Sequence, residues 1–73
     1  ADPGNAGWQR DLSVSYDKIA SIFERQGNRA EAFVHAEKSF LIDQALAARD
    51  PTNVTWQNDV QVSGDRLRRL QGK

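Results

Sequence analysis

Paired aspartates are the first residues in this sequence whose type and spacing could do chemistry. Asp11 and Asp17 recur 48 residues later as Asp59 and Asp65. Two carboxyl groups that share a site can act as acid and base. On a helix, however, positions six residues apart lie about 120° from coincidence, so the carboxyls of each pair do not converge. Helix caps and surface ion pairs explain these residues better, and we predict no catalytic residue and no enzyme activity.

His35 is the second candidate, because imidazole is a common metal ligand. It is the only histidine in the chain, and there is no cysteine. The nearby Glu31 and Glu37 do not complete a ligand set with it. We therefore interpret His35 as a solvated helix residue and predict no metal site and no cofactor.

The balance of charge argues against a nucleic-acid or membrane partner. Ten basic residues offset ten acidic ones and are spread along the chain, so no net field attracts either partner. The cluster Arg66, Arg68 and Arg69 is typical of a helix end, where positive charge complements the helix dipole. No run approaches the roughly 20 apolar residues of a membrane span and no basic-then-apolar leader is present. With no cysteine, the chain fits a reducing compartment, and we expect a cytoplasmic protein.

The most specific feature of the sequence is a repeat. Residues 2–19 recur without a gap as residues 50–67, with nine of the eighteen positions identical. A fixed period of this size indicates a repeat array, in which each unit buries its apolar face against its neighbours. We predict a single helical repeat domain over residues 1–73, as a fragment of a larger repeat protein. Repeat 1 spans about 2–49 and a partial repeat 2 spans about 50–71.

Local signals predict an all-α fold of three helices, the first two antiparallel. Asn5, Asn28 and Asn53 are good N-caps. Gly27 suits the left-handed residue that follows a helix, and Pro51 stops the second helix, because a residue before proline disfavours the helical region. The predicted helices lie near 6–26, 28–49 and 54–70.

Apolar residues recur at three- and four-residue steps, which predicts the core-facing side of each helix. The predicted core is Trp8, Leu12, Tyr16, Ile19, Phe23, Phe33, Phe40, Leu41 and Leu46. Val14 and Val62 each lie two residues from this stripe, roughly 200° around the helix. They therefore need another surface, which is either an adjacent helix of the stack or a bound partner.

The order of residues along the chain resembles the tetratricopeptide repeat. The residues that match the aromatic, aliphatic, small, aromatic, Gly, Ala, small and Pro positions of that family are Tyr16, Ile19, Ala20, Phe23, Gly27, Ala32, Ser39 and Pro51. Ala36 departs from the pattern, at a site that is usually aromatic. The proline comes seven residues later than in the 34-residue form, so the chain looks like the long-helix variety found in tandem arrays of large bacterial proteins. The resemblance covers nearly the whole chain.

This resemblance implies a stack of antiparallel helix pairs whose first helices line a groove that binds a peptide or protein segment. Carried over, the groove residues are Val14, Asp17, Ser21, Glu24, Arg25, Val62, Asp65 and Arg69. The implied function is a non-catalytic protein-interaction module. The alternative is a structural or self-association segment with no ligand of its own. Because the third helix lacks the neighbour that should follow it, we also expect the isolated chain to form a homodimer.

Overall fold

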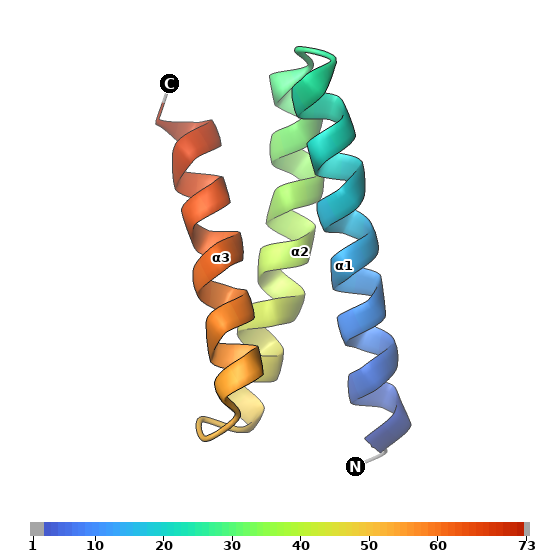
Figure 1. Cartoon of the computed structure of the whole chain (residues 1–73), viewed down its shortest axis with the longest axis vertical. Coiled ribbons are helices and arrows are strands. Elements are labelled where there is room, and N and C mark those ends of the chain that lie inside the picture. The colour runs from blue at the N-terminus through green and yellow to red at the C-terminus, as the bar shows by residue number, and fades with distance from the viewer. Residues whose placement is uncertain (1–2, 73) are drawn as a thin grey trace.

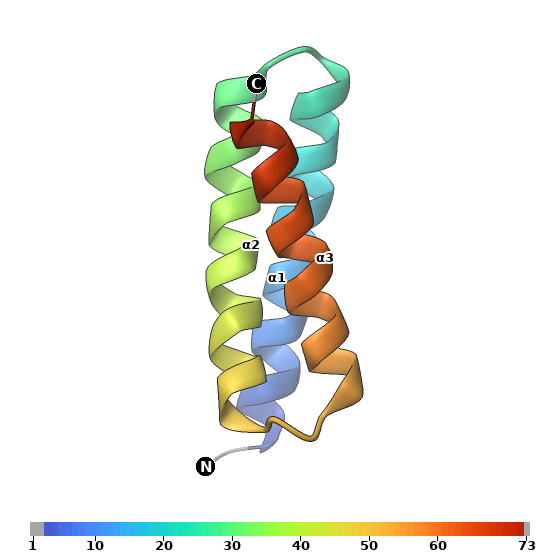
Figure 2. The same cartoon turned by 90° about the vertical axis from the view of Figure 1, so that its left-hand side faces the viewer.

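The chain forms three helices that run up, down and up (Figure 1). A computed structural model describes residues 3–72, with side chains from Gly7 onward. The helices are α1 (Pro3–Arg25), α2 (Arg29–Arg49) and α3 (Val54–Gln71). No strand occurs in the described residues, so the predicted all-α class is confirmed. Helix α2 packs against both α1 and α3, and Figure 2 shows α3 crossing in front of the other two helices.

The turn between α1 and α2 has the predicted glycine geometry. Gly27 has φ 80°, and its N–H donates to the Glu24 carbonyl at 3.0 Å. The Asn28 N–H donates to the Phe23 carbonyl at 2.9 Å. This pair of hydrogen bonds is the Schellman motif, which closes a helix on a left-handed residue. The Asn28 side chain then caps α2 by accepting from the Glu31 N–H at 3.3 Å.

The turn between α2 and α3 is fixed by one cap and one bridging amide. The Asn53 side chain accepts from the Trp56 N–H at 3.1 Å, which confirms the predicted cap. Gln57 Nε2 donates to the Ala47 carbonyl at 2.9 Å and to the Asp50 carbonyl at 3.3 Å. These bonds hold the start of α3 against the end of α2. At the other end of the chain α1 already begins at Pro3, so Asn5 lies inside the first turn and the prediction that it caps α1 was wrong.

The core consists mostly of small residues rather than the predicted aromatic ones. Leu46 is buried as predicted, but Trp8, Ile19 and Leu41 are exposed at 65%, 37% and 55% of their surface. The other predicted core residues, Leu12, Tyr16, Phe23, Phe33 and Phe40, are half-buried. The buried apolar residues are Ala20, Ala32, Ala36, Leu46, Ala47 and Leu70.

The reason for this difference is a rotation of α1 relative to the predicted orientation. The buried positions of α1 are Ser13 and Ala20, seven residues apart and therefore on one face of the helix. That face lies one residue, about 100°, from the stripe of large apolar residues. Helix α1 thus turns Ser13 and Ala20 towards α2, which lets the two helices approach closely, and leaves Trp8, Ile19 and Ile22 exposed. Phe23 still packs against the core.

Candidate interaction groove between α1 and α3

A buried polar cluster lies where the three helices meet. Asp43 of α2 is 5% exposed. The Ser13 hydroxyl of α1 contacts Asp43 Oδ1 at 2.5 Å and the Ser39 hydroxyl at 2.9 Å, and the Ser63 hydroxyl of α3 donates to Asp43 Oδ2. Both carboxylate oxygens therefore have a hydrogen-bond partner, which is the condition for burying such a group. This polar cluster connects α1, α2 and α3 and forms the floor of the groove above it.

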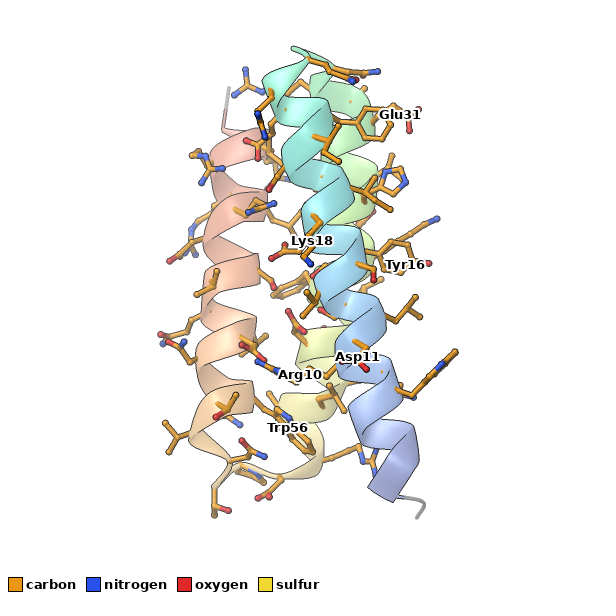
Figure 3. The ribbon with its side chains drawn as sticks, turned by 45° about the vertical axis from the view of Figure 1, so that its right-hand side comes forward. Arg10, Asp11, Tyr16, Lys18, Glu31 and Trp56 are labelled. Carbon is orange, nitrogen blue, oxygen red and sulfur yellow. The ribbon has the colours of Figure 1, made fainter. Side chains whose placement is uncertain are left out.

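Charged side chains bridge α1 and α3 above this floor. The two helices run in the same direction (Figure 1), and Figure 3 shows Arg10 reaching from α1 towards α3. The charged residues of α1 are spaced by seven, which places them on one side of the helix. The ion pairs, named here as the α1–α3 ladder, are Arg10 with Asp59, Asp17 with Arg66, and Glu24 with Arg69.

The lowest pair of the ladder has the best geometry. Arg10 Nε lies 2.8 Å from Asp59 Oδ2, and Arg10 Nη2 lies 3.4 Å from Asp59 Oδ1. The guanidinium therefore donates a hydrogen bond to each carboxylate oxygen. The hydrogen bond to Asp59 and its charge raise the pKa of the Arg10 guanidinium above its ordinary value. This pair holds the lower halves of α1 and α3 side by side.

The middle pair is looser and leaves a carboxyl oxygen without a hydrogen bond. Arg66 Nη1 donates to the Asp17 carbonyl and to the Ser21 hydroxyl, each at 2.9 Å. It lies 3.6 Å from Asp17 Oδ1, and that buried oxygen accepts no hydrogen bond from the described residues. Burial raises the pKa of Asp17, and the nearby Arg66 charge opposes the rise. Asp17 therefore carries its charge at a cost to stability.

Between the lowest and middle pairs lies a hollow of about 90 Å³. Val14 and Val62 stand at its edge with 40% and 51% of their surface exposed. The walls of the hollow combine these valines with three carboxylates and one guanidinium. Its lining residues are Arg10, Ser13, Val14, Asp17, Asp43, Asp59, Val62 and Ser63.

Six of the eight predicted groove residues lie along the seam between α1 and α3, which is the line that the α1–α3 ladder spans. Val14, Asp17 and Val62 line the hollow. Ser21, Glu24 and Arg69 lie further along the seam, where Ser21 contacts Arg66 and Glu24 pairs with Arg69 at 3.0 Å.

The other two predicted residues lie elsewhere. Arg25 is exposed and borders a separate depression with Ile22 and Gln26. Asp65 is exposed, pairs with Arg68 on its own helix, and borders a different depression, which Phe40 also lines. The structure does not bring Arg25 or Asp65 to the seam.

The groove floor is the part that sequence reasoning missed. Buried residues, most of them small, recur along α2 at alternating steps of four and three, a spacing that marks one helix face. Those residues are Ala32, Ala36, Ser39, Asp43 and Leu46, all buried. An aspartate and a serine inside an alanine stripe were the available signal that this face is buried and holds a polar cluster.

His35 packs against aromatic rings. Its ring centroid lies 5.3 Å from that of Phe23 and 6.2 Å from that of Tyr16, and its Nδ1 lies 2.9 Å from the Glu31 carbonyl. The residue is half-buried, so the prediction of a solvated histidine was only partly right. Among the described residues no group of histidines and carboxylates is arranged to hold a metal ion.

Comparisons with known protein families, curated proteins and solved structures find no match. Within residues 3–72, none of the three helices combines the length and the apolar character that crossing a membrane requires.

Proposed function

We propose that this chain is a non-catalytic protein-interaction module that holds a peptide or protein segment along the seam between α1 and α3. The observation that carries the proposal is the pair Val14 and Val62. These valines occupy the same position in the two repeats, lie at one hollow and remain exposed. Buried aliphatic side chains contribute about 1.5 to 3 kcal/mol each, so two adjacent exposed valines favour a partner that covers them. The tetratricopeptide-like arrangement, a longer bacterial array and a cytoplasmic location belong to the same proposal.

The size of the hollow limits how the segment binds. About 90 Å³ holds one small side chain and not a peptide backbone. The segment therefore runs along the seam and inserts a single side chain between Val14 and Val62. Asp17 and Asp59 at the same hollow favour a neighbouring positive charge on the segment.

The test is a fluorescent peptide library screened against the whole chain, followed by titration of its best ligand. Val14→Asp should weaken that ligand tenfold or more, about 1.4 kcal/mol, because it removes the apolar contact and buries a carboxylate without a hydrogen-bond partner under the bound segment. Val34→Asp is the matched control, since Val34 is 42% exposed on α2 and outside the hollow. Equal affinity of the parent and Val14→Asp would overturn the proposal.

A structural segment without a ligand is the second candidate. The observation that favours it is the ladder, because three ion pairs already span the gap between α1 and α3. A library screen in which the parent chain retains no peptide would support this candidate over the first.

Homodimerisation of the isolated chain belongs to the second candidate. Val54 of α3 is 79% exposed, and Val62 is exposed on the same helix, so α3 offers apolar surface to a second copy. Sedimentation over a concentration series should show a dimer whose formation Val54→Asp weakens. A chain that stays monomeric and folded at high micromolar concentration would contradict it.

A further inference from the structure

The outer side of α1 carries a stripe of four large apolar residues and one serine, named here the α1 stripe. Its members are spaced by four, three, four and three residues, which keeps them on one side of a helix. Ile22 is 51% exposed and Trp8 65% exposed, although both are strongly apolar. The stripe consists of Trp8, Leu12, Ser15, Ile19 and Ile22.

The same stripe recurs 48 residues later in α3, and there it is covered. Ser63 and Leu70 are 3% and 7% exposed, whereas their counterparts Ser15 and Ile22 are exposed. Trp56 is half-buried, in contrast to the exposed Trp8. The α3 stripe consists of Trp56, Val60, Ser63, Leu67 and Leu70. One sequence pattern is therefore seen twice in this molecule, once with its partner and once without.

The partner of the α3 stripe is α2. Asp43 of α2 accepts the hydrogen bond of Ser63, and Leu70 packs in one cluster with Ala36. Gln57, one residue beyond the tryptophan of the stripe, donates to the Ala47 carbonyl. The recognised surface of α2 is thus a set of small residues around one carboxylate, with an accepting carbonyl near the helix end.

The residues that make these polar contacts are retained on α1. Ser15 stands where Ser63 does, and Gln9 stands where Gln57 does. Ser15 is exposed and Gln9 half-buried. A surface for burial against lipid or against any apolar helix needs neither a hydroxyl nor an amide at those positions.

We propose that the α1 stripe is a docking surface for a helix with the chemistry of the α3-facing side of α2. Such a helix presents alanine-sized residues, a carboxylate that accepts from Ser15, and a carbonyl near its C-terminus that accepts from Gln9. It runs antiparallel to α1, as α2 runs antiparallel to α3. The surface is separate from the groove, because neither Val14 nor Val62 belongs to the stripe.

The experiment adds that helix to the same polypeptide chain and measures the fluorescence of Trp8. Residues 28–48 are copied directly ahead of Ala1 in the whole chain, which preserves the 48-residue period. Trp56→Phe in parent and extended chains leaves Trp8 as the only tryptophan. The extension should shift the Trp8 emission to shorter wavelength and reduce its quenching by iodide severalfold. Unchanged emission and quenching would overturn the proposal.

Three controls make the outcome specific. An extension with the same residues in scrambled order should leave Trp8 accessible, and Ile19→Lys in the properly extended chain should restore quenching. Changing the copied Asp43 to Leu should weaken protection, because Ser15 then loses its acceptor. Protection that survives Ile19→Lys would overturn the proposal.

A second copy of the chain is the rival occupant. If Trp8 of the unextended chain becomes protected as concentration rises, two copies cover the stripe and the proposal is wrong. Val14→Asp, which tests the groove, should leave Trp8 protection in the extended chain unchanged, so failure of the groove and failure of the stripe give different results.

Discussion

Asp43 is the residue that connects all three helices. It accepts hydrogen bonds from Ser13 of α1 and Ser63 of α3 while it lies on α2. A buried carboxylate is tolerated only when its oxygens are paired, and removing it leaves its donors unpaired. The stability of the chain therefore depends on this polar cluster as well as on its apolar core.

We expect Asp43→Ala to lower the free energy of unfolding by about 3 kcal/mol, because two hydroxyls lose their acceptor and a cavity remains. Asp43→Asn should cost about 1 kcal/mol, since the amide keeps the shape and can still accept one hydrogen bond. Urea denaturation followed by circular dichroism measures both changes. Asp11→Ala, at an exposed position, is the control and should change little. An Asp43→Ala chain as stable as this control would contradict the role given to the cluster.

Asp17 should make stability depend on pH. Burial raises its pKa above the ordinary 3.8, so the folded chain binds a proton more tightly at this site than the unfolded chain does. Stability contributed by Asp17 is therefore greatest below pH 3.8 and falls as pH rises through the raised pKa. Asp17→Asn has no carboxyl group to titrate at this position. The stability of Asp17→Asn relative to the parent should rise with pH from about 3.8 upward, as measured by urea midpoints. A difference that does not vary with pH would contradict this assignment.

At the scale of the helix, Gly27 sets where α1 ends. Its φ of 80° is strained for a residue with a side chain, and a Cβ there would meet no neighbouring atom within 4 Å. Gly27→Val should therefore destabilise through backbone strain alone, by roughly 1 kcal/mol or more. Thermal melting of the two chains measures the effect, with Gly7→Ala inside α1 as a control that should not destabilise. Equal melting temperatures for Gly27→Val and the parent would contradict the turn geometry.

The three helices and most of their ends could be predicted because their signals are local. The φ of Gly27, the Asn53 cap and the break at Pro51 each depend on a few neighbouring residues. The burial of each helix face could not be predicted in the same way. Large apolar residues indicate a buried face, but Ser13 and Ala20 face α2, and Trp8 faces outward.

At the scale of the whole molecule, the wrong prediction of which face of α1 is buried has a physical origin in the repeat. A helix in an array has two neighbours, so it has two buried faces, and apolar periodicity detects only the one with large side chains. In α3 the large face meets α2, whereas in α1 it is exposed. The groove residues were predicted from the resemblance, and most of them lie together. The polar floor formed by Asp43 could not be predicted, because it depends on how three helices pack and the pattern of a single helix does not contain that information.

The α1–α3 ladder gives the molecule a mechanical property. Helix α2 packs tightly against both of its neighbours, but charged side chains span the distance between α1 and α3. The side chains of these pairs are only partly exposed. Ion pairs near a protein surface contribute on the order of 1 kcal/mol each, and salt weakens them. Bending that opens this gap therefore meets a weaker restoring force than bending that separates α2 from either neighbour. We therefore expect the molecule to flex most readily in the direction that opens this gap, and rising salt to soften that direction first.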